Sequence, residues 1–587
     1  MNRQSQDAGQ MLEKGFFGLF ALYFLLGMHF FMHNPGGSGL YLPFNAWGWM
    51  FASLAIGLGL WQVTLRQRLI WSSLQGWFWV GALLLLLPMA YPGFELKDYA
   101  IPRLLGLFAG MLFLSCLYQW ALDAGRRERL LYLVLGAVAI EALLGLIEYY
   151  LLVPGNWLGY DTRNNRPYGI FQQPNVMASF MATGLVLAAW LEGRGRLAGP
   201  WLTGLRYGLM LACPLLLVVL QSRVGQLGAL LGVILLLPML KERKLATRVL
   251  LLVALGILLG LASQLLIAGA KRGLEVYQSG GMRSIYWPYA IKLIMQAPWS
   301  GWGYGSFESV FLHHYMADKA LQPEMVQIEY NLDHPHNEFL YWAVEGGIVP
   351  MLGMLLMGGA ILWRLSQTRW RQGLALLALV TPILLHSQTE YPFYHAIVLW
   401  WVLLLLLFVL DSEVEEQAPG PDWREHVYRP WLLLRFLAIG IPLLVVPFML
   451  TAIHTAWVVT KYERGGYKQP ALLLEVVNPL AWLTRVEFDV NSVRLLVGLQ
   501  AHNQQELMAY LDWGQEFVRH TPRANIYANM IVALNALGRE EEAKALRQQA
   551  LLLYPADPLL TGKAASVATA LEKRPAVSAS SAAIQAP

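Results

Sequence analysis

The sequence has little charge and almost no cysteine, and both shortages limit what the protein can be. Charged residues make up only 14% of the 587 residues, whereas soluble domains carry about a quarter. This composition, together with 56% hydrophobic residues, excludes an ordinary soluble globule. Cys116 and Cys213 are the only cysteines and both lie inside apolar stretches. A thiol there is more often a small core residue than half of a disulfide, so cysteine says nothing about the redox compartment.

Long apolar runs dominate the chain. Many windows of about 20 residues lack charge, and each is long enough to cross roughly 30 Å of hydrocarbon as a helix. We expect about thirteen spans, starting near residues 16, 46, 71, 104, 130, 176, 206, 225, 248, 338, 373, 394 and 432. No small-residue cleavage site follows the first run, so that run is expected to remain as a signal anchor. The expected fold class is an all-α polytopic membrane protein.

Lysine and arginine gather in short clusters between the apolar runs. The net charge of +5 does not indicate a nucleic-acid partner, because these clusters form no continuous surface. The positive-inside rule instead fixes an orientation with the N-terminus inside and an odd number of spans placing the C-terminus outside. Five basic groups then fall in the cytoplasm: Arg66/Arg68, Arg126/Arg127/Arg129, Arg194/Arg196/Arg206, Lys241/Arg243/Lys244/Arg248 and Arg364/Arg369/Arg371.

Composition also predicts the domains. Residues 1–460 form the expected transmembrane domain, in which the loop 269–337 is too polar and too rich in turn residues for lipid and is predicted to be a folded outer cap. Residues 461–573 read as a soluble helical domain. Within it, residues 523–558 resemble one tetratricopeptide repeat, and the helices before it should stack with it, since one repeat cannot bury its own apolar face. Residues 574–587 are predicted to be a disordered tail.

The most informative segment is DHPHNEFLYWAVEGG, which starts at Asp333 and opens an apolar helix at the membrane surface. A neutral imidazole there, such as that of His336, suits proton removal from an attacking hydroxyl near neutral pH. The alternative carries equal weight: Asn337 or Asp333 caps the helix, and the histidines are merely interfacial.

Two arginines are candidate phosphate ligands. Arg223, in QSRVGQLGALLG, interrupts two apolar spans with almost no loop between them. Its guanidinium fork suits a lipid-linked pyrophosphate, although a lone interfacial arginine more often reaches toward lipid headgroups. Arg283, in the large outer loop, is a candidate second phosphate contact, but an exposed loop arginine is usually only solvated.

Amides and aromatic residues form two further candidate sites. In RNNRPYGIFQQPNVMASF, the side chains of Gln172, Gln173 and Asn175 suit sugar hydroxyls, but capping of the helix that follows is the favoured interpretation. In HSQTEYPFYH, Glu390 and Tyr391 lie in a short outer turn that is equally well explained by an aromatic belt. All the candidates fall on one side of the topology that Lys and Arg fix. Polar clusters at a membrane surface favour a functional site.

In this order, GIFQQPN, HPHNEFL and EYPF resemble the O-antigen ligase superfamily of polytopic glycosyltransferases, and within it the bacterial protein O-oligosaccharyltransferases, or pilin glycosylation ligases. The resemblance covers most of the chain. It implies transfer of a preassembled glycan from undecaprenyl pyrophosphate to a Ser or Thr hydroxyl of a periplasmic or pilin protein. The reaction would take place at the periplasmic face of the bacterial inner membrane, with a large periplasmic loop and a periplasmic C-terminal domain. No metal or nucleotide cofactor is implied.

The resemblance also implies residue roles. Carried over by position, His336 would be the catalytic histidine, Arg223 a pyrophosphate-binding arginine, and Tyr391 a residue of the acceptor or donor site. The expected substrate-binding set also includes Arg283, Gln172, Gln173, Asn175, Asn337 and Glu390.

Three rival functions remain. An O-antigen ligase that acts on lipid A core and a glycan polymerase would share the donor chemistry, but GIFQQPN, EYPF and the repeat-like domain favour a protein acceptor. A lipid or sugar transporter would require polar residues at mid-membrane depth and internal repeats, and the sequence shows neither.

Overall fold

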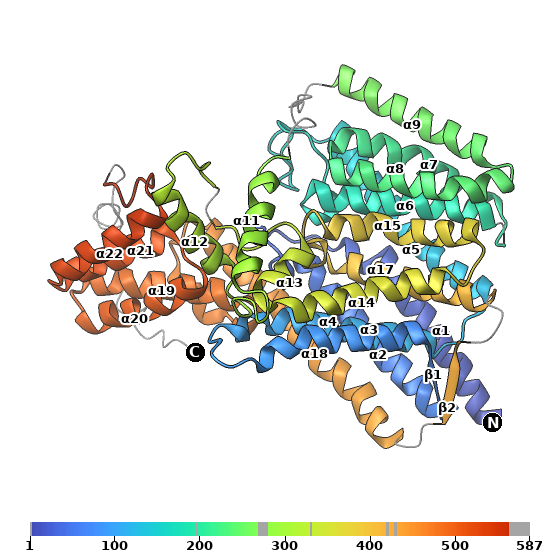
Figure 1. Cartoon of the computed structure of the whole chain (residues 1–587), viewed down its shortest axis with the longest axis horizontal. Helices are drawn as coiled ribbons and strands as arrows, with labels where there is room; N and C mark the ends of the chain where they lie inside the picture. The colour runs from blue at the N-terminus through green and yellow to red at the C-terminus, as the bar shows by residue number, and fades with distance from the viewer. Residues whose placement is uncertain are drawn as a thin grey trace. The chain divides into compact units, whose positions relative to one another are not determined.

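The computed structural model describes residues 3–194, 196–267, 280–328, 331–417, 422–427 and 431–562, and these are almost entirely helical (Figure 1). Among them, twelve helices are long and apolar enough to cross a membrane, which confirms the expected fold class. They are α1 (Arg3–Leu25), α2 (Pro43–Arg66), α3 (Ser73–Leu86), α4 (Ile101–Tyr118), α5 (Ala124–Tyr150), α6 (Pro174–Arg194), α7 (Pro200–Leu220), α8 (Arg223–Glu242), α9 (Ala246–Leu266), α14 (Ile348–Leu365), α17 (Ile397–Glu415) and α18 (Trp431–Arg464).

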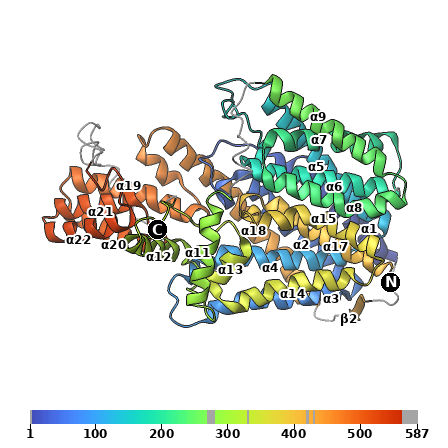
Figure 2. The same cartoon turned by 45° about the horizontal axis from the view of Figure 1, so that its top comes forward.

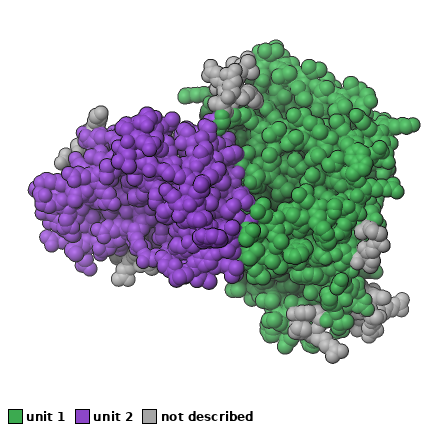
Figure 3. Space-filling model, in the orientation of Figure 1, with its two compact units in different colours: residues 1–84, 104–280, 352–453 green, residues 85–103, 281–351, 454–587 purple. Residues whose placement is uncertain are grey.

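The chain divides into two compact units, coloured green and purple in Figure 3. Unit 1 comprises Met1–Leu84, Leu104–Gly280 and Leu352–Ile453, and unit 2 comprises Leu85–Arg103, Gly281–Met351 and His454–Pro587. Each unit therefore combines segments that are distant in sequence. The tail predicted at 574–587 and the loop residues 268–279 lie outside the described residues.

Unit 1 is built around α6 and α17, whose most apolar windows are both 94% buried, so other helices surround them. Helix α6 packs against α7, α8 and α15 (Trp370–Ser387), and α7 in turn packs against α9. Figures 1 and 2 both show these helices side by side. Small residues permit the close approach: a Cβ added to Gly184 of α6 would lie 2.3 Å from Val138 of α5. Interfaces of this kind are typical of membrane helices, because close backbone packing replaces the hydrophobic effect there.

Helix α15 accounts for the span expected near residue 373. It is not among the twelve most apolar helices, yet it runs the length of unit 1. Helix α6 begins beside Glu390, just after the end of α15, and ends at Arg194, which pairs with Glu413 of α17. We call the end of unit 1 near Glu390 its first end and the end near Arg194 its second end. Helix α15 starts at the second end, five residues after Leu365, and finishes at the first. The described residues thus contain twelve helices that are long and apolar enough to span a membrane, against about thirteen expected, and α15 corresponds to the remaining one.

The single span expected from residue 338 is instead two helices. Helix α13 (Glu338–Gly346) ends at Gly347, and α14 begins one residue later. Gly347 has φ +69°, which L-residues rarely adopt, and a Cβ there would lie 2.5 Å from the Trp299 carbonyl oxygen. The apolar pattern of the sequence continues across Gly347, because one residue in a left-handed conformation does not change the spacing of apolar residues. The sequence therefore predicted one helix where the structure has two.

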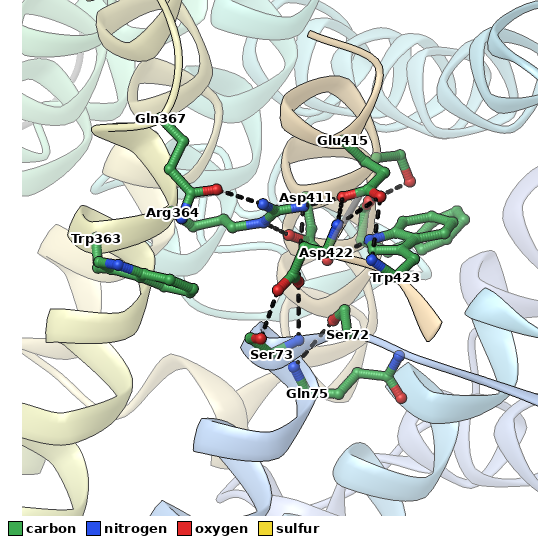
Figure 4. Close-up of polar contacts among 12 residues, drawn as sticks. Ser72, Ser73, Gln75, Trp363, Arg364, Gln367, Asp411, Glu415, Asp422 and Trp423 are labelled. Carbon is green, nitrogen blue, oxygen red and sulfur yellow. Dashed lines mark hydrogen bonds and ion pairs between the residues drawn. The ribbon is translucent and has the colours of Figure 1, made fainter. Parts of the chain in front are cut away.

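The second end of unit 1 carries a buried charge network, shown in Figure 4. Arg364 of α14 pairs with Asp411 of α17, and both side chains are fully buried. Arg364 also pairs with Glu415 at 2.5 Å. Glu415 in turn accepts a hydrogen bond from the Asp422 amide at 2.9 Å, and the Asp422 carboxylate accepts one from the Ser73 amide at 2.9 Å. The network holds the segment before β2 against the start of α3.

Two short strands extend this attachment. Strand β1 (Arg68–Trp71) pairs antiparallel with β2 (Arg424–Val427), with Arg68 opposite Val427 and Trp71 opposite Arg424. The sequence interpretation treated Arg364 only as a topology signal. The structure shows that it is also an internal partner of several carboxylates, as a buried guanidinium must be to offset its loss of hydration.

Unit 2 contains α11 (Arg283–Gln296), α12 (Phe307–Leu321) and α13, together with four C-terminal helices. These four are α19 (Leu483–Gln500), α20 (Gln504–His520), α21 (Ala524–Ala536) and α22 (Glu540–Leu553), and consecutive members pack against one another. Gly538, at φ +74°, makes the turn between α21 and α22. The helical hairpin expected at 523–558 is present, whereas its assignment as a tetratricopeptide repeat stays a prediction.

The burial of Arg364 leads to a stability prediction. Asp411→Ala should destabilise the protein by roughly 3 kcal/mol, near the low end for a broken buried ion pair because Glu415 remains. The measurement is thermal unfolding of the detergent-solubilised protein. The matched control is Glu425→Ala, which removes the partner of the exposed Arg68 and should change stability by less than about 1 kcal/mol. Equal unfolding midpoints for the two variants would contradict the prediction.

Candidate functional site

A buried segment that is not α-helical, and that contains the short 3-10 helix Gly169–Phe171, enters the first end of unit 1 and is held there by two glutamates of α5. The Glu148 carboxylate accepts hydrogen bonds from the amides of Tyr168 and Gly169, both at 2.8 Å. The Glu141 carboxylate accepts one from the amide of Ile170 at 3.0 Å. Backbone that is not helical must find such partners inside a membrane protein, because lipid offers none. The two glutamates therefore supply the hydrogen-bond acceptors that this segment needs in order to be buried.

Gly169 is needed for the shape of this segment. Its φ is +57°, and a Cβ added there would lie 2.2 Å from Oε2 of Glu141. The other carboxylate oxygen of Glu141 is 2.6 Å from Nδ1 of His29. The Glu141 side chain is thus fixed between His29 and the turn at Gly169. The sequence interpretation did not single out Glu141 or Glu148, although a carboxylate inside an apolar helix is itself a signal.

The amides of the GIFQQPN motif lie at the start of α6. The side-chain oxygen of Gln173 accepts a hydrogen bond from the Asn175 amide at 3.2 Å, so Gln173 takes part in capping, as the favoured interpretation of the sequence held. Gln172 adopts a left-handed φ of +56°. The Asn175 side chain donates to Oε1 of Glu390 at 3.3 Å. The structure therefore brings the GIFQQPN and EYPF segments together.

The EYPF segment forms a fixed turn. Helix α16 (Pro392–His395) follows Tyr391, and the rings of Tyr391 and His395 stack with centroids 4.6 Å apart. Asn45 of α2 donates to the carbonyl of His395 at 2.9 Å and accepts from the amide of Ile397 at 2.9 Å. These bonds hold Tyr391 and Glu390 at the same end of unit 1 as Asn175.

Arg223 is the first residue of α8 and lies at the same end. The Ser222 side chain caps the helix, and Gly225 packs against Ala178, in the second turn of α6. Arg166, from the segment before GIFQQPN, donates from Nε to the carbonyl of Leu220 at the end of α7, at 2.9 Å. A second arginine thus reaches the α7–α8 turn. The sequence interpretation considered only the amides of this segment.

The remaining candidates, Arg283, His336 and Asn337, belong to unit 2. The Asn337 side chain accepts a hydrogen bond from the Leu340 amide at 2.9 Å and so caps α13. His336 just before it has φ +55°, and its amide donates to Nδ1 of His334 at 2.8 Å. His334 is buried, whereas His336 is partly exposed. The two histidines therefore differ. The buried His334 side chain stabilises the turn by accepting a hydrogen bond, whereas the His336 side chain projects from the turn and stays partly exposed.

Helix α11 supports this turn from one side. The Tyr286 ring stacks on the His336 ring, with centroids 6.2 Å apart and planes 18° apart. The Trp287 indole donates to the Pro335 carbonyl at 3.1 Å. Arg283 lies one helical turn before Tyr286, and residues so spaced share a helix face. Unit 2 therefore places Arg283 and His336 on neighbouring elements.

Arg103 secures α13 from within unit 2. It pairs with Glu345 at 2.6 Å, and both side chains are buried. Its guanidinium lies over three aromatic rings, 4.0 Å from the centroid of Trp342, 4.4 Å from that of Tyr341 and 4.9 Å from that of Tyr304. Sequence reasoning missed this arginine because its partners are 201 to 242 residues away, at positions that local patterns do not connect.

No group of three His, Cys, Asp or Glu side chains that could hold a metal ion occurs within the described residues. The arrangement instead offers two kinds of chemistry: arginines at helix starts, which suit phosphate oxygens, and a partly exposed imidazole on a rigid turn, which suits proton transfer.

Three family models match the chain. A model described as protein glycosylation ligase matches residues 167–191, one described as O-antigen ligase matches residues 208–355, and one described as virulence factor membrane-bound polymerase, C-terminal, matches residues 374–568. The first match begins at the segment that Glu141 and Glu148 hold. No curated protein matches the chain.

The close approach at Gly169 can be tested against a second glycine. Gly169→Ala should lower the unfolding midpoint of the solubilised protein, because backbone strain of about 1 kcal/mol adds to an overpacking term of roughly 1–3 kcal/mol against Glu141. Gly159→Ala is the matched control: its φ is +72°, but no atom lies within 4 Å of its added Cβ. If both variants lose the same stability, the contact with Glu141 does not matter.

Proposed function

Because the chain belongs to the O-antigen ligase superfamily, and so is a glycosyl-transferring enzyme, we propose that it transfers a preassembled glycan from undecaprenyl pyrophosphate to a Ser or Thr hydroxyl of a periplasmic or pilin protein. One observation carries the choice of a protein acceptor. The match to a protein glycosylation ligase falls on the buried segment that is bonded to α5 and contacts the EYPF turn through Asn175 and Glu390.

The donor is assigned to the arginine-bearing end of unit 1. Arg223 starts α8, where the helix dipole also favours an anion. Arg166 donates to the carbonyl of Leu220, which lies two residues before Ser222. Guanidinium groups bind phosphate oxygens in pairs of parallel hydrogen bonds. When the bond between the anomeric carbon and the diphosphate breaks, negative charge grows on the leaving oxygen. Arg223 would stabilise that charge.

The acceptor step is assigned to His336. The acceptor hydroxyl attacks the anomeric carbon of the glycan, His336 removes or shares the hydroxyl proton, and the lipid diphosphate leaves. The turn between His334 and Asn337 holds the imidazole partly exposed, which gives a large substrate access to it. Gln172, Gln173, Tyr391 and Arg283 remain proposed substrate contacts.

The periplasmic face of the inner membrane is the proposed location. It is supported by the arrangement inside unit 1, where Arg127, Arg194, Arg206 and Arg364 lie at the end opposite Asn175 and Arg223, within ion pairs. Basic residues mark the cytoplasmic ends of membrane helices.

A glycan polymerase is the second candidate, because the match at residues 374–568 carries that description. Both functions use the same donor, and they differ only in whether the accepting hydroxyl belongs to a protein or to another glycan. The product therefore decides between them.

The deciding experiment is coexpression with a candidate pilin and a lipid-linked glycan, followed by intact-mass measurement of the pilin. The pilin should gain the mass of the glycan. His336→Ala should lower the transfer rate by roughly 10²- to 10⁴-fold, the range for loss of a general base. His502→Ala, at an exposed histidine in the turn between α19 and α20, should leave the rate unchanged. Polymerised lipid-linked glycan with unmodified pilin would favour the polymerase.

Arg223 can be tested in the same assay at equal membrane abundance. Arg223→Ala should weaken transfer without loss of the folded protein, because Arg223 is assigned to the diphosphate. Arg223→Lys should restore only part of the activity, since an ammonium lacks the two-pronged geometry. Arg163→Ala is the control, at an exposed arginine of the loop before GIFQQPN. Full activity of Arg223→Ala would return this arginine to a role at the lipid surface.

A further inference from the structure

A charged cluster joins the C-terminal helices to the loop that bears His336. Arg523, just before α21, forms an ion pair with Glu308 of α12 through Nη1, and its Nη2 lies 3.4 Å from the second carboxylate oxygen. The Glu308 side chain is only 8% exposed. This pair spans 215 residues of sequence, and all of its atoms belong to unit 2.

Asp333 connects this pair to His336. The charges of Arg523 and His336 both act on the Asp333 carboxylate, and the charge of Asp333 acts on Glu308. Asp333 as a residue is exposed, but protein atoms crowd its carboxyl group. The charges of two carboxylates, one guanidinium and one imidazole therefore act on one another, although the groups come from three separate segments of the chain.

The electrostatics of the cluster depend on Arg523. Burial raises the pKa of the Glu308 carboxyl to about 7, and Arg523 opposes that rise. Desolvation raises the pKa of the Asp333 carboxyl, and Arg523 and His336 oppose the rise. His520, which also faces Arg523, has its pKa lowered to about 4 by burial and by that arginine, so it stays neutral near pH 7.

We propose that the C-terminal helical segment completes the reaction centre, with Arg523 as a positioning residue that pairs with Glu308 and balances the charge of Asp333 in the loop of His336. The proposal rests on the role of His336 in the proposed function. A carboxylate next to an imidazole stabilises the positive charge that the imidazole gains when it takes a proton. Arg523 would act through the acids, without touching the substrate.

Attachment of the domain does not require this ion pair. Arg519 of α20 already pairs with Glu95, and the His520 ring stacks on Tyr99 with centroids 3.5 Å apart. These contacts tie the C-terminal helices to residues 85–103. The Arg523–Glu308 pair instead reaches α12, whose Phe311, one turn after Glu308, contacts the Tyr286 ring that stacks on His336. This favours a role in the site over a purely structural one.

Opposite charge changes should shift the pH dependence of transfer in opposite directions. Without Arg523, both carboxylates hold their protons to higher pH, so the acid limb of the kcat/KM profile moves up. Glu308 and Asp333 interact, so their two carboxyl groups titrate in two coupled steps. Without Glu308 the upper step disappears, and the acid limb of the kcat/KM profile moves to lower pH. A general loss of folding cannot produce shifts of opposite sign.

The experiment measures pilin glycosylation rates from about pH 5 to 9 for the full-length protein and its variants, at matched abundance and unfolding midpoint. Arg523→Gln should move the acid midpoint up by roughly half to one pH unit, which lowers kcat/KM about 3- to 10-fold on that limb. Glu308→Gln should move the midpoint down. Arg523→Lys should stay closer to the unmodified protein. Arg519→Gln, at an exposed arginine near the end of α20, should not shift the midpoint.

The outcomes separate the two proposals. If the unmodified protein transfers no glycan at any pH, the proposed function is wrong. If it is active and Arg523→Gln changes the rate equally at every pH, or not at all, Arg523 is structural and this inference is wrong. If Arg523→Gln does not fold, an unchanged acid midpoint in Glu308→Gln overturns the inference by itself.

Discussion

Buried backbone groups must form hydrogen bonds within the protein, and this requirement determines the structure of the first end of unit 1. Glu141 lies nine residues before the last residue of α5, Tyr150, or roughly 14 Å along the helix at 1.5 Å per residue. A chain that enters to this depth without α-helical hydrogen bonds needs acceptors and donors from its neighbours. Two carboxylates meet the need for the amides of Tyr168, Gly169 and Ile170. The start of α6 follows directly, and with it Asn175, Glu390 and the Tyr391 turn.

The other end of unit 1 meets a related demand with charge. Glu413 accepts ion pairs from Arg127 of α5 and from Arg194 of α6, and the Arg364 network binds α14 to α17. Arginines that orient the chain in a membrane thereby also fasten its helix ends. An exposed cluster would satisfy the positive-inside rule equally well, but it would contribute little to stability. Burial with paired partners makes each arginine expensive to remove, because an unpaired charge would be left behind.

Sequence patterns predicted what depends on local or periodic information. The long helices follow from apolar length, and the Asn337 cap follows from its place before an apolar run. The break at Gly347 was missed, because one left-handed residue leaves no periodic trace. Arg103 and Arg523 were missed for a different reason. Their roles depend on residues far along the chain, such as Glu345 for Arg103 and Glu308 for Arg523, and one sequence does not reveal which distant positions meet.

The backbone at His336 gives a physical reason to regard this residue as more than a turn former. A left-handed conformation costs a non-glycine residue roughly 1–2 kcal/mol, and glycine would relieve it without loss of the Asn337 cap. The chain keeps a histidine there and surrounds it with supports: Tyr286 on the ring, His334 on the amide, and Trp287 on the preceding carbonyl. This retained strain supports the proposed role of the His336 side chain. A fixed, partly exposed imidazole has lost its orientational freedom before any acceptor arrives, which is the condition under which proton removal is most effective.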